Sequence, residues 1–187
     1  SPCVMIDTDF ICWKPLALLV DGLDAAAIHR EDIMPDIYPG PASFTQTHGF
    51  AFSAFDWSVQ PLNTALSYFG SDTFRRYYTD TAIRFIRSSP SADDVLTYMV
   101  FAEQRLLAMC AEKKQACVAA FSDLPALFGG GQNGYFTHIW GFKQQMRDEP
   151  VLYDDFCRRC AARLQRDFSE AAERIAHVPS LAPYFHD

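Results

Sequence analysis

Cys3-Val4-Met5-Ile6-Asp7-Thr8-Asp9, close to the start of the chain, is the stretch that decides the fold. A short apolar run ends abruptly there in two carboxylates separated by one threonine. Such a run indicates a buried strand, here a parallel one. Because α/β folds bind their ligands beyond the carboxyl ends of parallel strands, Asp7 and Asp9 are predicted to lie at the functional edge of a sheet.

The rest of the chain alternates between apolar runs of strand length and longer segments with helical periodicity. Further short strands are predicted at residues 25–29, 62–68, 117–121 and 135–139. Helices are predicted from residue 72 to about 86, from 94 to about 116 and from 149 to about 176. Ser71 and Asp72 are predicted to cap the first of these helices. The pattern therefore predicts an α/β fold with a short mixed sheet and several long helices.

The composition is that of one compact, acidic domain. The chain has 187 residues with a formal net charge of −7, and 49% of them are hydrophobic. We therefore expect a single domain over residues 1–187, with a helical tail from about residue 149. Nucleic-acid binders normally present a basic face, so a nucleic-acid partner is not expected.

Six scattered cysteines and the absence of a long apolar run bear on location. A disulfide-stapled secreted domain would be smaller and richer in cysteine, so we expect reduced thiols and a cytoplasmic or membrane-peripheral protein. No apolar run approaches the roughly 20 residues of a membrane-spanning helix, so no transmembrane segment is expected. Because the chain begins at Ser1 and enters a predicted strand almost at once, its natural beginning is expected to be missing.

Asp7 and Asp9 carry the first candidate chemistry. Carboxylate oxygens are hard ligands that suit Mg²⁺ or Mn²⁺, and these ions usually share their coordination shell with substrate phosphates. Successive side chains of a strand alternate in direction, so one carboxylate can reach the ion while the other acts through water or a sugar hydroxyl. The alternative is a solvated turn that contains two aspartates.

A second candidate group is the stretch His138-Ile139-Trp140-Gly141-Phe142-Lys143. The His138 imidazole can complete an aspartate-rich Mn²⁺ site. Gly141 lets a phosphate approach the backbone, and Lys143 supplies a positive charge to that phosphate. Trp140 offers a surface for stacking on a sugar ring. The alternative is a strand histidine that bonds to a neighbouring carbonyl, beside a solvated lysine.

Three further polar residues are candidates because of their settings. Glu103 and Gln104 lie in the middle of a predicted helix, where an exposed glutamate is ordinary. Asn63 stands in an apolar run just after Pro61. A buried asparagine needs partners for both its carbonyl and its amide, so the sequence favours a specific polar role for Asn63.

In their order along the chain, these features resemble the retaining glycosyltransferases of the GT-A fold. The resemblance is to glycosyltransferase family 8, which includes glycogenin and bacterial galactosyltransferases. The D-x-D strand of that family is matched by residues 4–9, and its N-x-G by Asn63-Thr64-Ala65 with alanine in place of glycine. Its D-Q pair is echoed by Glu103-Gln104, and its histidine–glycine–lysine motif by His138, Gly141 and Lys143.

The resemblance covers about residues 3–145 and implies the C-terminal part of a GT-A domain, on the metal and acceptor side. Nucleotide-binding βα units would precede Asp7 in that family, and a chain lacking them is expected to bind metal poorly and is not assumed to be active. The implied reaction moves a sugar from a nucleotide sugar, expected to be a UDP-sugar, to a glycan or lipid-linked acceptor. The implied cofactor is Mn²⁺ or Mg²⁺.

The resemblance also assigns roles to particular residues. The metal is implied to be held by Asp7, Asp9 and His138. The substrate is implied to be bound by Lys143, Gly141, Trp140 and Asp7. The residues implied to act at the reacting face are Gln104, Glu103 and Asn63. Two other interpretations remain open. A phosphatase of the haloacid-dehalogenase type also begins with an apolar strand and D-x-D, with Asp7 as nucleophile. A helical interaction domain without enzymatic activity is the other alternative.

Overall fold

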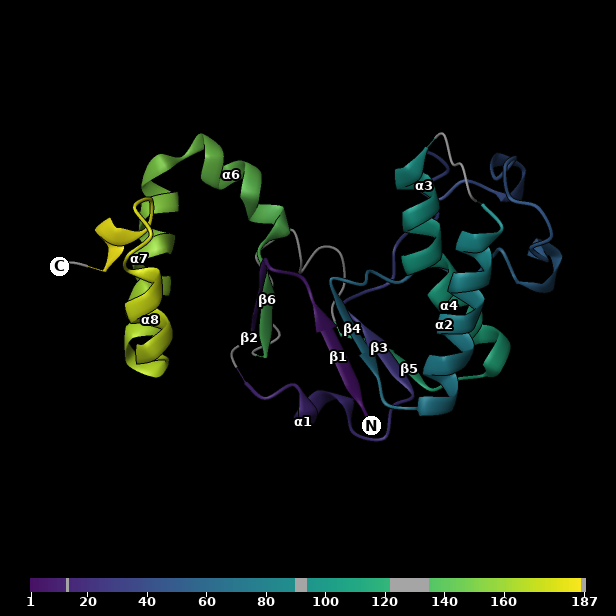
Figure 1. Cartoon of the computed structure of the whole chain (residues 1–187), viewed down its shortest axis with the longest axis horizontal. Helices are drawn as coiled ribbons and strands as arrows, with labels where there is room; N and C mark the ends of the chain where they lie inside the picture. Colours follow the sequence, from purple (N-terminus) through teal and green to yellow (C-terminus); the bar gives the residue numbers. More distant parts are fainter. Residues whose placement is uncertain (13, 90–93, 122–134, 186–187) are drawn as a thin grey trace. The chain divides into compact units, whose positions relative to one another are not determined.

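The computed structural model describes all residues except 13, 90–93, 122–134 and 186–187 (Figure 1). The chain divides into two compact units, Ser1–Ile139 and Trp140–Asp187. The helices after Ile139 pack chiefly on one another. The single domain over residues 1–187, with a helical tail from about residue 149, stays a prediction.

The first unit is built on a four-stranded mixed sheet in the order β1-β4-β3-β5 (Figure 1). The strands are short: β1 (Cys3–Ile6), β3 (Ala25–Ala27), β4 (Leu66–Phe69) and β5 (Val118–Ala120). β4 runs antiparallel to both β1 and β3, whereas β3 and β5 are parallel. The prediction of an α/β protein with a short mixed sheet is confirmed.

β1 differs from its prediction as a buried parallel strand. It lies at the edge of the sheet and runs antiparallel to β4. Val4, Met5 and Ile6 are 44%, 56% and 47% exposed. An edge strand pairs with a neighbour on one side only. The described part of the chain also leaves the side chains on both faces of β1 largely uncovered. A short apolar run predicts a strand but not its place in the sheet.

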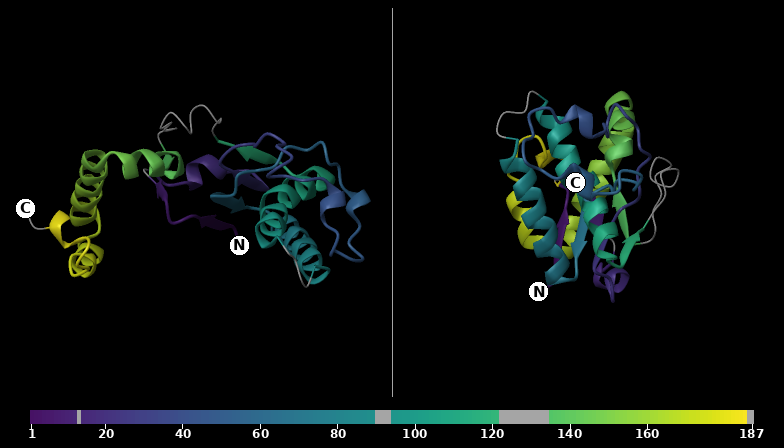
Figure 2. Two further views of the ribbon diagram at one scale, coloured as in Figure 1. Left: turned by 90° about the horizontal axis from the view of Figure 1, so that it is seen from above. Right: turned by 90° about the vertical axis from the view of Figure 1, so that its right-hand side faces the viewer.

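A helical layer covers one face of this sheet (Figures 1 and 2). It consists of α2 (Asp72–Arg87), α3 (Val95–Val100), the π-helix η3 (Phe101–Arg105) and α4 (Leu106–Lys114). The Ser71 hydroxyl accepts a hydrogen bond from the backbone N–H of Phe74, so the predicted N-cap of α2 is confirmed. The helix predicted over residues 94–116 is present, but one π-helical turn interrupts it, and sequence periodicity does not reveal such a turn.

The core of the first unit lies between these helices and the sheet and is rich in aromatic rings. Phe85 and Leu106 are completely buried. The ring centroids of Phe44 and Phe101 lie 4.6 Å apart, and both rings also approach Phe85. Such ring pairs contribute roughly 0.5–1.5 kcal/mol each beyond the apolar area that they bury. These rings fasten the loop that carries Phe44 to the helical layer.

A two-stranded antiparallel sheet completes the first unit. β2 (Phe10–Cys12) follows β1 after a tight turn and pairs with β6 (Phe136–His138). The register sets Phe10 opposite His138, and the rings of Phe10 and Phe136 stack with 4.7 Å between their centroids. The pairing therefore brings the end of the first unit back to the segment that follows β1.

The second unit is helical. The 3₁₀ turn η4 (Trp140–Phe142) and α6 (Lys143–Asp148) lead into α7 (Pro150–Asp167), which packs against α8 (Ser169–Ile175). The single helix predicted over residues 149–176 is therefore broken at Phe168, whose backbone is not helical. Shorter elements complete the described chain: α1 (Ala17–Val20) and the 3₁₀ turns η1 (Pro41–Ser43), η2 (Phe52–Ala54) and η5 (Ala182–Tyr184). Among the described residues, no helix is both long and apolar enough to cross a membrane.

Candidate metal centre

Asp7 and Asp9 lie in the turn that connects β1 to β2. The backbone N–H of Phe10 donates to the Asp7 carbonyl at 3.2 Å, which closes the turn. The Asp7 N–H donates to the Ala65 carbonyl at 2.8 Å, which ties the turn to the segment before β4. Aspartate is frequent in turns because its side chain tolerates their backbone conformations. The turn, rather than the alternation of a strand, therefore positions the two carboxylates.

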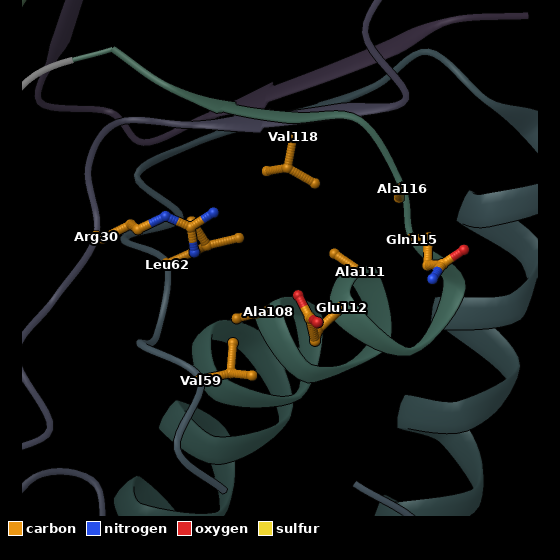
Figure 3. A pocket seen from close by; sticks show the side chains of 9 residues that line it. All are labelled: Arg30, Val59, Leu62, Ala108, Ala111, Glu112, Gln115, Ala116 and Val118. Carbon is orange, nitrogen blue, oxygen red and sulfur yellow. The ribbon is translucent and has the colours of Figure 1, made fainter. Parts of the chain in front are cut away.

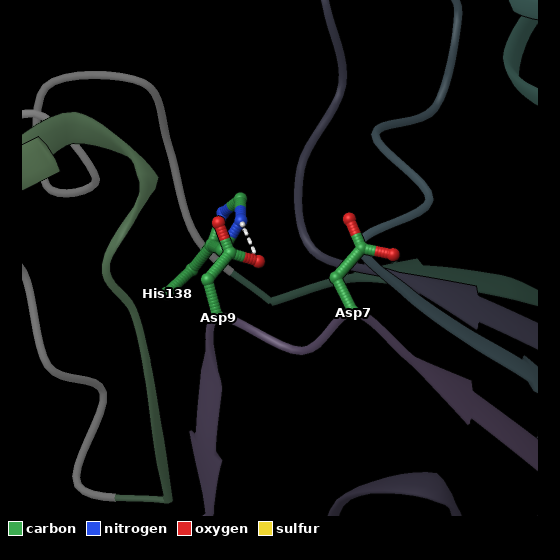
Figure 4. Close-up of side chains that lie close together, drawn as sticks. All are labelled: Asp7, Asp9 and His138. Atoms are coloured by element: carbon green, nitrogen blue, oxygen red, sulfur yellow. Dashed lines mark ion pairs between the residues drawn. The ribbon is translucent and has the colours of Figure 1, made fainter. Parts of the chain in front are cut away.

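His138 reaches the same place from the other end of the first unit. It is the last residue of β6, and the N–H of the next residue, Ile139, donates to the Asp9 carbonyl at 3.0 Å. The imidazole lies beside the Asp9 carboxylate, with His138 Nε2 3.5 Å from Asp9 Oδ1 (Figure 4). The His138 side chain is 4% exposed and that of Asp9 12%. Strand pairing thus brings together residues that are far apart in the sequence.

Asp7, Asp9 and His138 each offer one ligand atom, and these atoms lie within 4.8 Å of one another (Figure 4). Two ligands of one ion are at most about twice the metal–ligand distance apart, which is roughly 4.2 Å for Mg²⁺ and roughly 5 Å for Ca²⁺. The three atoms therefore lie close to the spacing of ligands on a single divalent ion, and a small side-chain movement would complete that spacing for the smaller ions. Carboxylates favour Mg²⁺ or Mn²⁺ and imidazole favours transition metals, so the mixed set suits Mn²⁺ better than Mg²⁺. Asp7 is exposed, which leaves that side of the group open to a substrate.

Asn63 belongs to a second polar group, together with His29 and Glu31. Its side-chain amide donates to Glu31 Oε1 at 2.9 Å, and its side-chain oxygen accepts from the Ala65 N–H at 3.1 Å. His29 Nε2 lies 3.0 Å from the same Glu31 oxygen. Asn63 therefore has partners for both ends of its amide, in agreement with the specific polar role predicted for it.

Backbone geometry explains why Asn63 stands at this position. The pairing of β3 with β4 matches Ala27 with Ser67, and the next bridge matches Arg30 with Leu62. One strand thus advances three residues (27 to 30) while the other advances five (67 to 62), so the chain bulges between Leu62 and Ser67. The Asn63 oxygen stabilises this bulge by accepting the N–H two residues further on, a bond typical of asparagine.

Gln104 and Glu103 have different surroundings, although both lie on the π-helix. The Tyr38 hydroxyl donates to Gln104 Oε1 at 2.5 Å, and the Gln104 carbonyl accepts from the Leu62 N–H at 3.3 Å. Gln104 therefore lies against the segment that carries Asn63. Glu103 is exposed and lines a largely apolar hollow of about 480 Å³ between α2 and α3. The structure thus brings Gln104, but not Glu103, next to the Asn63 group.

Trp140, Gly141 and Lys143 belong to the second unit. Trp140 and Gly141 lie in η4, and Lys143 is the first residue of α6. The Trp140 side chain is 54% exposed. Their predicted roles in binding a phosphate or a sugar stay predictions.

His29 and Glu31 are the residues of this sheet edge that the sequence reasoning missed. They follow β3 as Ile28-His29-Arg30-Glu31, just as Asp7 and Asp9 follow β1. The rule that identified the two aspartates, polar residues two apart at the end of an apolar run, applies to them equally. The run before them consists of alanines, which is a weaker strand signal than Val-Met-Ile.

A small cavity lies on the α4 side of the sheet (Figure 3). The side chains of Arg30 and Glu112 are the charged groups that line it, among mostly apolar neighbours. Its volume is about 100 Å³. Sites for small molecules usually measure about 300–1,000 Å³, so this cavity is too small to be a substrate site.

Comparisons of this chain with protein-family models, with curated proteins and with solved structures gave no match.

Proposed function

We propose that this chain is the metal-binding part of a GT-A glycosyltransferase, which transfers a sugar from a UDP-sugar to a glycan or lipid-linked acceptor. One observation carries the proposal: Asp7, Asp9 and His138 place three ligand atoms within 4.8 Å of one another. The same three residues are the metal ligands implied by the resemblance to glycosyltransferase family 8. A chance cluster would not be expected to select those three positions from the 187 residues of the chain.

The residues of the site have different roles in binding. Asp9 and His138 form the inner, buried side, and the exposed Asp7 forms the side that faces a substrate. A bound Mn²⁺ would stabilise the negative charge of the departing diphosphate. The oxygen of the Gln104 amide accepts a hydrogen bond from Tyr38, and its nitrogen is a donor suited to a substrate hydroxyl.

Calorimetric titration of the full-length protein with UDP, with and without Mn²⁺, tests this proposal. We expect UDP to bind in the presence of Mn²⁺ only, because the nucleotide is held through the ion. Asp9→Asn and His138→Gln should each weaken this binding by at least tenfold, since the loss of one ligand costs more than about 1.4 kcal/mol. Asp36→Asn and His48→Gln make the same changes at exposed positions away from the site and should leave UDP binding unchanged.

Two results would contradict the proposal. UDP binding that is absent, or that does not depend on Mn²⁺, removes its basis. Release of phosphate from p-nitrophenyl phosphate by the wild-type protein, lost in Asp7→Asn, would instead favour the phosphatase in which Asp7 is the nucleophile.

A further inference from the structure

Glu31 is tied by hydrogen bonds to the candidate metal centre. β1 and β3 both run antiparallel to β4, so β1 and β3 point the same way and their C-terminal ends lie at the same end of the sheet. The Asp7 N–H donates to the Ala65 carbonyl at 2.8 Å, and the Ala65 N–H donates to the Asn63 side-chain oxygen at 3.1 Å. The Asn63 amide in turn donates to Glu31 at 2.9 Å. The carboxylate and the turn that holds the metal ligands are therefore parts of one connected structure.

One oxygen of the Glu31 carboxylate is left for a ligand. Oε1 accepts a hydrogen bond from the Asn63 amide at 2.9 Å, and His29 Nε2 lies 3.0 Å from the same oxygen in an ion-pair contact. Oε2 makes no hydrogen bond to the residues that the structure describes, and it is not among their buried unpaired atoms. The side chain retains 13% exposure. An ionised carboxylate only accepts hydrogen bonds, so a ligand at Oε2 must bring an O–H or N–H group.

The charge of Glu31 limits the chemical class of ligand that it can bind. Burial raises the pKa of this carboxyl, but the hydrogen bonds from His29 and Asn63 and the charge of His29 outweigh that effect, and the pKa is lowered overall. A negative charge here repels a phosphate, so the diphosphate of a nucleotide sugar is not the group that it binds. A sugar hydroxyl is neutral, donates a hydrogen bond and accompanies a diphosphate bound at the metal centre.

We infer that Glu31 binds a hydroxyl of the hexose on which the enzyme acts, either the donor sugar or the acceptor sugar, and that His29 and Asn63 are positioning residues for its carboxylate. This inference rests on the proposed function. It adds a substrate-binding residue, in the segment that follows β3, that lies outside the motifs of the family resemblance.

Calorimetry with the full chain and Mn²⁺ compares three probes: UDP, UDP-glucose or UDP-galactose, and methyl hexosides added to the Mn²⁺–UDP complex. In Glu31→Gln, UDP should bind as in the wild type. The UDP-hexose, the methyl hexoside or both should bind about tenfold more weakly, because a hydrogen bond to a charged group has been replaced by a neutral one. A loss for UDP-hexose identifies the donor sugar, and a loss for the methyl hexoside alone identifies the acceptor. Asp32→Asn removes an exposed carboxylate next in sequence and should change none of these affinities.

His29 supplies the test of positioning. His29→Gln retains a side-chain donor and should keep most of the hexose affinity, whereas His29→Leu should lose it while UDP still binds. Equal weakening of UDP and UDP-hexose in Glu31→Gln would overturn the inference, because Glu31 would then act on the metal centre or the fold. Unchanged binding of all three probes would overturn it as well. A wild-type protein that binds no UDP in the presence of Mn²⁺ overturns the proposed function and this inference together. The other two results leave UDP binding by the wild type intact, so they overturn this inference alone.

Discussion

The Glu31 carboxylate is held below its ordinary pKa of 4.5, as a net result of burial, which raises the pKa, and of His29 and Asn63, which lower it more. A carboxyl whose pKa is lower in the folded than in the unfolded state stabilises the fold above the unfolded pKa. That contribution is lost as the pH falls through the folded-state pKa. Because the pKa of Glu31 is lowered in the folded state, we expect this carboxylate to stop stabilising the fold as the pH falls below about 4.5.

Glu31→Gln should accordingly be less stable than the wild type at pH 7, and the two proteins should converge as the pH falls below 4.5. Urea unfolding followed by circular dichroism at a series of pH values measures this difference. Asp32→Asn, whose carboxylate is exposed, serves as the control and should track the wild type. A difference between Glu31→Gln and wild type that stays constant across this range would contradict the linkage.

Cys110 is a completely buried thiol on α4, and burial raises its pKa to about 12. At pH 8 only roughly one molecule in ten thousand then carries the reactive thiolate. We expect iodoacetamide to modify the exposed Cys117 in the folded protein and to leave Cys110 unmodified until denaturant is added. Mass spectrometry of peptides from the treated protein measures the modification of each cysteine. Equal modification of both cysteines under native conditions would contradict the described core.

The π-helix η3 is held by Arg105, which is 3% exposed. Its guanidinium donates to the Tyr38 carbonyl at 2.8 Å and to the Trp57 carbonyl at 2.7 Å, and it stacks on the Trp57 ring. The element thereby organises the long loop before β4 and presents Gln104 to Tyr38. A π-helical turn inside an α-helix is often found at functional sites.

Arg105→Met removes both hydrogen bonds while it keeps much of the side-chain volume. Hydrogen bonds to charged groups contribute about 1.5–3 kcal/mol each, so we expect the free energy of unfolding to fall by about 3 kcal/mol. Chemical denaturation of the variant measures the loss. Arg87→Met, at an exposed position on α2, should change stability by less than about 0.5 kcal/mol. If Arg105→Met also lowered the free energy of unfolding by less than about 0.5 kcal/mol, the hydrogen bonds from the guanidinium to the two carbonyls would not stabilise the fold.

The elements themselves were largely predictable, whereas their surroundings were not. Apolar runs and Ser71 located the strands and the start of α2, because these features depend on local sequence. The edge position of β1 depends on which strands it pairs with, and no local pattern encodes that choice. The π-helical turn and the break at Phe168 escaped prediction because helical periodicity continues across both.

At the scale of the whole molecule, the candidate site lies at the C-terminal ends of β1 and β3, and β6 of the two-stranded sheet adds His138 to it. Asp7, Asp9 and His138 were predicted to act together, and the first unit brings them within reach of one ion. His29 and Glu31 were not predicted, since their proximity to Asn63 arises only from the pairing of β3 with the bulged segment before β4. All of these residues lie within the first unit, so the proposed metal binding depends on that unit.

Electron paramagnetic resonance tests metal binding at Asp7, Asp9 and His138 most directly, because the sharp six-line signal of free Mn²⁺ broadens when the ion binds a protein. Titration of the protein with Mn²⁺ should give one bound ion per chain, and Asp9→Asn and His138→Gln should each release it at the same concentrations. His48→Gln should bind as the wild type does. Wild-type protein that leaves the Mn²⁺ signal unchanged, or binding that survives both substitutions, would contradict the central claim.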